Sequence, residues 1–122
     1  TIDGFPCSGK TTLGRFLAWR FNISLVETDL FLIRNQGSFI YRNRDIRAVI
    51  EHRIQSDRPI IIEGVVALKI LNDVGYDSSF HIRVCCDETA DEAASDTSWQ
   101  EYLTSYKPRA DASLMLDIPA NE

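Results

Sequence analysis

The sequence has 122 residues and a net charge of −5, and 44% of its residues are hydrophobic while 25% are charged. This composition indicates one globular domain over residues 1–122, and the acidic balance argues against nucleic acid as a partner. No apolar run approaches the roughly 18 residues that span a membrane. The three cysteines, two of them adjacent, favour a reducing, cytoplasmic setting over a disulfide framework.

Residues 4–12, GFPCSGKTT, match the phosphate-binding pattern G-x-x-x-x-G-K-T. The two glycines let successive backbone N–H groups turn toward one anion, and the following helix adds its own N-terminal N–H groups. Lys10 can then reach the outer phosphates, and the Thr11 hydroxyl can coordinate Mg²⁺. The predicted nucleotide-binding residues are Gly4, Phe5, Pro6, Cys7, Ser8, Gly9, Lys10, Thr11 and Thr12.

Only Thr1 and Ile2 are available as the end of a strand before this loop, whereas a strand usually needs about five residues. We therefore expect the natural protein to begin before Thr1. After the loop, residues 12–21 carry apolar residues at spacings of three and four, which predicts a helix. Its apolar positions are Leu13, Phe16, Leu17 and Phe21.

Further along, apolar runs alternate with helical patterns, which is typical of an α/β fold with a parallel sheet. The runs predict strands over 23–31, 59–68, 79–86 and 112–119 and a helix over 44–55. A capping box from Ser98 to Glu101 predicts the start of another helix, which ends at Pro108. Trp19 and Trp99 are expected to pack helices.

Two carboxylates follow predicted strands, Asp29 after the second and Glu63 after the third. In open α/β sheets ligands bind at the carboxyl ends of the strands. Asp29 could accept the proton of an attacking hydroxyl, and Glu63 could hold Mg²⁺ directly or through water. The alternative is that either acid faces solvent or caps a helix, but two such acids beside a phosphate loop favour a site.

The stretches IDGFPCSGKTTLG, VETDLF and RPIIIEGVVAL resemble the uridine kinase group of P-loop kinases, which includes phosphoribulokinase and pantothenate kinase relatives. The resemblance runs from Ile2 to about Leu68, with a weaker echo in YKPRADASLMLD. It implies a five-stranded parallel sheet of order 2-3-1-4-5 and transfer of the γ-phosphoryl group of ATP to a small-molecule hydroxyl, such as that of a nucleoside. It also implies that Lys10 binds the β- and γ-phosphates, that Thr11 and Glu63 hold Mg²⁺, and that Asp29 is the general base.

The arginines that family members carry after the fourth strand, in a lid over ATP, are missing. Residues 84–108 contain six acids, one lysine and no arginine. Either Arg83, Lys107 or Arg109 supplies the cation, or this segment is not the lid; Arg109 is our candidate catalytic arginine. Most of the acids are expected to form a solvated helix face.

Residues 34–58 show the opposite imbalance, with six arginines against three acids. In related kinases this region shapes the acceptor pocket, so Phe39 and Tyr41 are candidates to stack on a ring or pack a sugar. Arg42 or Arg44 could receive an anionic acceptor, because a guanidinium suits carboxylate or phosphate. The alternative is that these are ordinary surface arginines.

Two other functions stay open. VETDLFL also looks like the D-x-D region of shikimate or gluconate kinases, although those families usually carry glycines where this chain has IEG. The missing arginine lid would also suit a non-catalytic ATP-binding regulator. The sequence leaves the oligomeric state undecided, including whether the protein is a homo-oligomer.

Overall fold

The computed structural model describes residues 1–86 and 95–119. Its centre is a five-stranded, all-parallel sheet of order β2-β3-β1-β4-β5, which confirms the predicted topology. The strands are β1 (Ile2–Gly4), β2 (Ser24–Glu27), β3 (Ile60–Glu63), β4 (Ile82–Cys85) and β5 (Leu114–Asp117). The register sets Glu27 beside Glu63, so the carboxyl ends of β2 and β3 lie at the same level.

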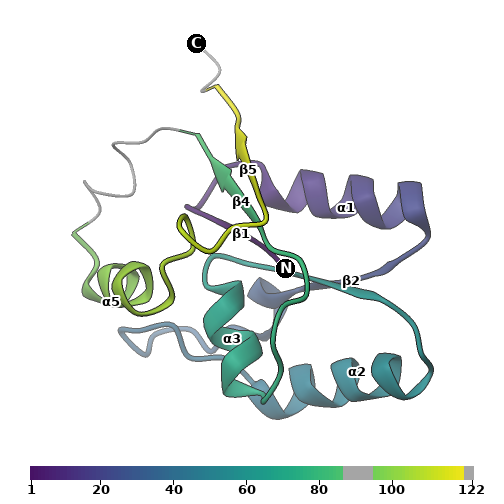
Figure 1. The fold of residues 1–122 in the computed structure, drawn as a ribbon. Coiled ribbons are helices and arrows are strands. Elements are labelled where there is room, and N and C mark those ends of the chain that lie inside the picture. The colour runs from purple at the N-terminus through teal and green to yellow at the C-terminus, as the bar shows by residue number, and fades with distance from the viewer. Residues whose placement is uncertain (87–94, 120–122) are drawn as a thin grey trace.

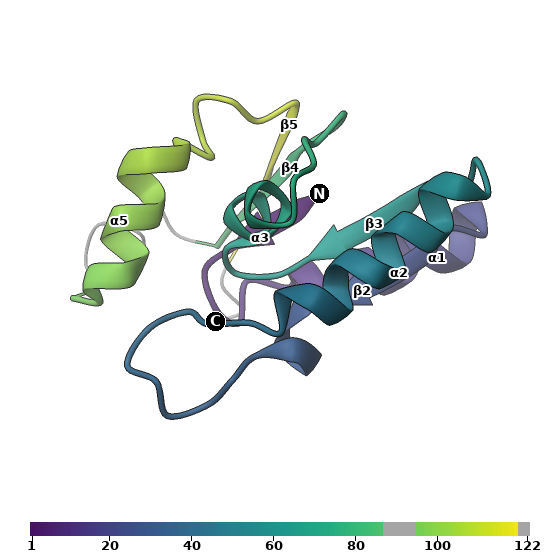
Figure 2. The same ribbon diagram turned by 90° about the horizontal axis from the view of Figure 1, so that it is seen from below.

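The helices lie on both sides of the sheet (Figures 1 and 2). They are α1 (Lys10–Phe21), α2 (Asn43–Gln55), α3 (Ala67–Asp73) and α5 (Thr97–Tyr106), and a 3₁₀ turn, η1 (Thr28–Phe31), follows β2. No helix within these described residues has both the length and the apolar character needed to cross a membrane.

Two separate cores explain why β3 reads as a continuous apolar run. Ile61 joins the smaller core, formed with Leu13 and Leu17 of α1. Ile60 and Ile62 instead join the larger core, which includes residues of α2, α3 and α5. Successive strand side chains point to opposite faces, so a strand covered on both faces must be apolar at every position.

The second and third predicted strands were too long. The second ends at Glu27, where η1 begins, and the third ends at Glu63 rather than Leu68. The helix α3, which follows soon after β3, was not predicted. Its first residues continue an apolar run, Val65, Val66 and Ala67, all of which are buried. Periodicity alone cannot distinguish a buried strand from the start of a buried helix.

The predicted capping box at Ser98 was also wrong, because the N-cap of α5 lies two residues earlier, at Asp96. The Asp96 carboxylate is the cap and accepts hydrogen bonds from the N–H groups of Ser98 and Trp99. The helix ends before Pro108, as predicted, with Lys107 in a left-handed conformation at φ 45°.

The two tryptophans behave differently. Trp99 is buried in the larger core, as predicted, whereas Trp19 is 77% exposed and packs no helix against the sheet. Phe16 and Phe21, predicted on the apolar face of α1, are also exposed. The spacing of apolar residues therefore predicted a broader buried face of α1 than the structure has. The α1 side chains that pack in the smaller core are Leu13 and Leu17.

Candidate active site

The chain between β1 and α1 forms a loop around the amino end of α1. Cys7 and Gly9 adopt left-handed conformations at φ 65° and 88°, and the Ser8 N–H donates to the Phe5 carbonyl at 3.2 Å. Gly9 caps α1 without any side-chain hydrogen bond. The first N–H groups of the helix therefore have no side-chain acceptor and are available to an anion.

Gly4 and Ser8 show that the loop is shaped for close approach. A β-carbon on Gly4 would lie 2.4 Å from the Val84 carbonyl oxygen and 2.7 Å from Ser8 Oγ, so only glycine fits there. Ser8 Oγ itself is buried and has no hydrogen-bond partner among the described residues. A buried polar atom without a partner is costly, and a phosphate oxygen would supply one. The loop therefore fits the phosphates of a nucleotide.

Lys10, Thr11 and Glu63 meet at the amino end of α1. Lys10 is 4% exposed, with Nζ 3.5 Å from the Phe5 carbonyl oxygen, and Thr11 Oγ1 donates to Glu63 Oε1 at 3.1 Å. Burial raises the pKa of Glu63, while the Lys10 charge and the Thr11 hydrogen bond oppose the shift. A hydroxyl and a carboxylate are hard oxygen ligands of the kind that Mg²⁺ accepts.

These oxygens do not form a complete metal cage. Within the described ranges, no three His, Cys, Asp or Glu side chains are grouped so that they could hold a metal ion. Mg²⁺ usually keeps several waters and binds one or two carboxylates together with substrate phosphates. The pair of Thr11 and Glu63 therefore fits a magnesium ion whose remaining ligands come from a nucleotide and water.

Asp29 lies in η1, exposed to solvent, and is close enough to Glu63 to raise the pKa of that carboxyl further. Burial raises the pKa of Tyr41, and the charges of Asp29 and Glu63 add to the shift. The Tyr41 hydroxyl and the two carboxylates therefore share one electrostatic environment. Tyr41 is 7% exposed and packs in the larger core, which leaves its ring little open face for a ligand. Its role in holding an acceptor stays a prediction.

An ion pair that we did not predict lies beside these carboxylates. Arg15 Nε and Nη2 donate to the two oxygens of Glu27 at 2.6 and 2.9 Å, and this hydrogen bonding holds the pKa of Glu27 below its ordinary value. Glu27 is the register neighbour of Glu63. Besides Glu63 and Asp29, Glu27 is the third carboxylate at the carboxyl ends of β2 and β3, and its ion pair with Arg15 neutralises its charge. Sequence could have indicated it, because Arg15 follows Thr11 by one helical turn.

Arg42 precedes α2, and its guanidinium contacts residues of η1. Its Nη2 donates to the Leu30 carbonyl at 3.1 Å, and its guanidinium lies 5.6 Å from the centre of the Phe31 ring. It is therefore beside η1, the element that carries Asp29. Arg44 is exposed in the first turn of α2.

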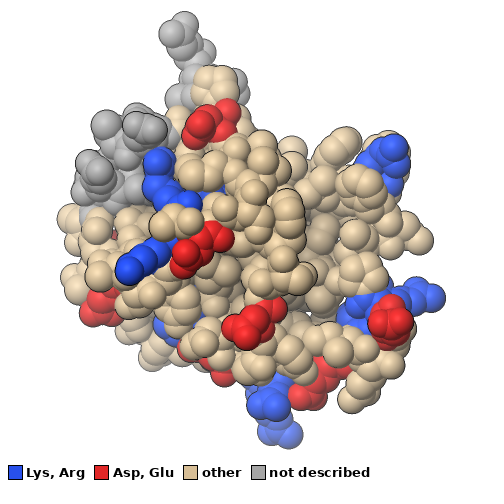
Figure 3. Space-filling model, in the orientation of Figure 1, with Lys and Arg blue, Asp and Glu red and all other residues tan. Residues whose placement is uncertain are grey.

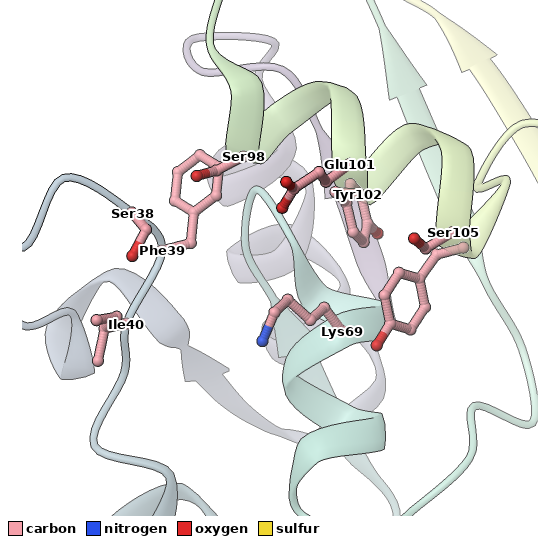
Figure 4. A pocket seen from close by; sticks show the side chains of 9 residues that line it. Ser38, Phe39, Ile40, Lys69, Ser98, Glu101, Tyr102 and Ser105 are labelled. Carbon is pink, nitrogen blue, oxygen red and sulfur yellow. The ribbon is translucent and has the colours of Figure 1, made fainter.

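Two cavities border α5, and Phe39 lines both. The smaller, about 290 Å³, is bordered by the phosphate loop and α5 and is lined by Phe5, Pro6, Phe39, Val65, Ser95, Asp96 and Trp99. The larger, about 450 Å³, lies between α3, α5 and the segment 38–40 (Figure 4). Lys69 and Glu101 project into it from α3 and α5. Neither Arg42 nor Arg44 lines either cavity.

Of the three cations considered for the lid, Arg83 is excluded because its side chain is fully buried against Asp3. Lys107 is exposed at the end of α5. Arg109 is half-buried, and its Nη2 lies 3.5 Å from Cys85 Sγ at the end of β4. Four of the acids in the proposed lid, at positions 87, 88, 91 and 92, lie outside the described residues.

Arg109 is linked to the phosphate loop through Cys85, at the end of β4, and Ile118, which follows β5. The N–H of Ile118 donates to the Cys85 carbonyl at 2.7 Å, and Ile118 Cδ1 lies 3.4 Å from where a β-carbon on Gly9 would be. Arg109 is therefore at the edge of the sheet that carries the loop. On the face seen in Figure 3, basic and acidic side chains are interspersed rather than gathered by sign.

No family model and no curated protein matches the sequence. A solved structure from Bacillus stearothermophilus, described as a possible uridine kinase, superposes with a TM-score of 0.66 at 16% sequence identity. The match covers 95% of this chain and 86% of that chain. At this identity the likeness shows the fold, and the five-stranded parallel sheet with its flanking helices is a P-loop kinase fold.

Proposed function

We propose that this protein transfers the γ-phosphoryl group of ATP to a hydroxyl of a small molecule, such as a nucleoside. The observation that carries the proposal is the meeting of Lys10, Thr11, Glu63 and Asp29 at one edge of the sheet. Phosphoryl transfer requires positioning and neutralisation of negative charge more than covalent chemistry. These residues would supply a phosphate cradle, a metal site and a proton acceptor.

On the nucleotide side, the loop N–H groups, Ser8 Oγ and Lys10 would hold the phosphates. Thr11 and Glu63 would hold Mg²⁺, which when bound neutralises charge on the β- and γ-phosphates. Arg109 would approach from the end of β4. Glu63 must be ionised to hold the ion, and the nearby Lys10 charge favours that state.

On the acceptor side, Asp29 would accept the proton of the attacking hydroxyl, since it is exposed and adjoins the metal site. The smaller cavity would hold the acceptor against Phe39, because this cavity borders the phosphate loop directly. Arg42 and Arg44 would meet only an acceptor that extends beyond η1.

A second candidate, a nucleotide-binding regulator without catalysis, is favoured by one observation. The burial of Arg83 leaves Arg109 and Lys107 as the cations that could replace the missing lid arginines. One cation at the wrong distance would leave charge on the transferring group without compensation.

A screen of ADP release over nucleosides, pantothenate, sugar phosphates and hydroxy acids separates these functions. We expect turnover of a neutral hydroxyl acceptor with Mg²⁺ and none with Lys10→Ala. Turnover of hydroxy acids alone would favour the shikimate or gluconate type. Calorimetric binding of ATP without turnover of any acceptor would favour the regulator.

A further inference from the structure

Asp3 is a fully buried carboxylate immediately before Gly4, the first residue of the phosphate-binding pattern. Its Oδ2 accepts hydrogen bonds from Arg83 Nη1 at 2.9 Å and from the Tyr102 hydroxyl at 2.5 Å. His81 Nε2 lies 3.0 Å from Oδ1. Arg83 and His81 belong to β4 and the residue before it, which adjoin β1 in the sheet in any case. Among the described residues that contact the Asp3 carboxylate, Tyr102 is the one that belongs to a more distant element, α5.

A second contact joins α5 to the loop on the other side of Gly4. The Trp99 ring meets the Phe5 ring edge-on, with centroids 5.6 Å apart, and the Arg83 guanidinium lies 5.2 Å from the centre of the Trp99 ring. Trp99 and Tyr102 are each 2% exposed and lie 5.7 Å from one another. The helix α5 therefore contacts the chain on both sides of Gly4, at Asp3 and at Phe5.

We propose that Tyr102 and Trp99 are positioning residues that couple the phosphate loop to α5. The inference rests on the proposed function, since it concerns how the nucleotide and acceptor sides are kept in register. A hydrogen bond to a buried carboxylate is stronger than a neutral one and fixes its partner's orientation. Two attachments, one polar and one aromatic, make the helix follow any movement of the loop.

The consequence for the acceptor follows from what α5 lines. Trp99 lines the smaller cavity and Tyr102 lines the larger one. The helix that contacts the loop therefore also lines both cavities. A small displacement of a positioned group lowers the rate steeply. Loosening α5 should therefore impair use of the acceptor while the loop still binds ATP.

The test uses Tyr102→Phe, which removes one hydroxyl and keeps the ring. The matched control is Tyr106→Phe on the same helix, because within the described part of the chain the Tyr106 hydroxyl has one hydrogen bond, accepted from the exposed Asn72 amide at 3.3 Å. A Trp19→Phe background leaves Trp99 as the single tryptophan, and Trp19 is exposed enough to be replaced safely. Trp99 emission then reports the contact between α5 and the loop without turnover.

We expect ATP with Mg²⁺ to change Trp99 emission, with the same half-saturation as calorimetric binding. In Tyr102→Phe, the ATP dissociation constant should stay within about threefold while kcat/KM for the acceptor falls on the order of tenfold. Tyr106→Phe should match wild type in both. Phe5→Leu, which cuts the contact from the loop side, should weaken the emission response even if Tyr102→Phe folds poorly.

ATP binding without any change in Trp99 emission would overturn the coupling and leave the proposed function intact. Equal kinetic effects of Tyr102→Phe and Tyr106→Phe would do the same. Absence of calorimetric ATP binding would overturn both the coupling and the proposed function.

Discussion

Thr28 Oγ1 lies 1.9 Å from the point where a β-carbon on Gly64 would be, and Thr28 Cβ lies 3.1 Å from that point. The end of β3 and the start of η1 therefore touch at a position that admits only glycine. Glu63 precedes that glycine and Asp29 follows that threonine. This close approach is what brings the proposed metal ligand and the proposed base together.

Gly64→Ala should destabilise the fold by about 1–3 kcal/mol, as other overpacked sites do, and should also lower kcat by separating Asp29 from Glu63. Urea denaturation and steady-state kinetics measure the two effects. Thr28→Ala in the same protein removes the clashing oxygen and should restore part of each loss. If the double variant were as unstable as Gly64→Ala alone, the clash with Thr28 would not be the cause of the lost stability.

Lys10→Ala should abolish phosphoryl transfer, with a loss on the order of 10²-fold or more in kcat/KM for ATP, because one preorganised charge is removed from the transferring group. Among the described residues, Lys10 Nζ makes one hydrogen bond, to the Phe5 carbonyl at 3.5 Å, so the variant should still fold. Unchanged kcat/KM would rule out the phosphate-binding role of the loop.

Glu63→Gln should have opposite effects on stability and activity. Because burial raises the pKa of Glu63, the folded protein holds this proton more tightly than the unfolded chain does. Stability is then highest below the ordinary value of 4.5 and falls as pH rises toward the raised value. The amide removes this penalty, so at neutral pH and without ligands the variant should melt at a higher temperature than wild type.

The same substitution should raise the Mg²⁺ concentration needed for half-maximal rate, because an amide oxygen lacks the charge that a hard cation prefers. Melting curves from pH 4 to 8 check the effect on stability. The difference in melting temperature between Glu63→Gln and wild type should shrink toward pH 4. A variant less stable than wild type at every pH would contradict the assigned cost of burying Glu63.

The α/β class and the sheet edge that carries the loop could be predicted because both depend on local patterns, whereas the strand order was implied only by the resemblance to the uridine kinase group. The pattern from Gly4 to Thr11 has one common structural use, and three consecutive isoleucines before Glu63 mark a strand buried on both faces. The solved structure described as a possible uridine kinase shares this fold.

The contacts that tune the site could not be predicted, since they join residues far apart in sequence. Nothing near Asp3 shows that Tyr102, 99 positions later, donates to it. In the sequence, Arg83 is a cation at the start of a segment that contains few others. In the structure it forms an ion pair with the buried carboxylate of Asp3. The close approach of Thr28 to Gly64 likewise depends on the packing of η1, which periodicity does not reveal.

Asp29→Asn tests the base directly. If Asp29 accepts the hydroxyl proton, the substitution should lower kcat while ATP affinity stays near wild type, because the lost interaction forms only as the acceptor gives up its proton. The acidic limb of the pH–rate profile should disappear as well. Asp45→Asn is the matched control, since Asp45 is an exposed acid in the first turn of α2 that forms a long ion pair with Arg42, at 3.7 Å. Normal kcat in Asp29→Asn, or a defect confined to ATP binding, would make Asp29 a structural residue of η1 and leave the acceptor proton to water or to another group.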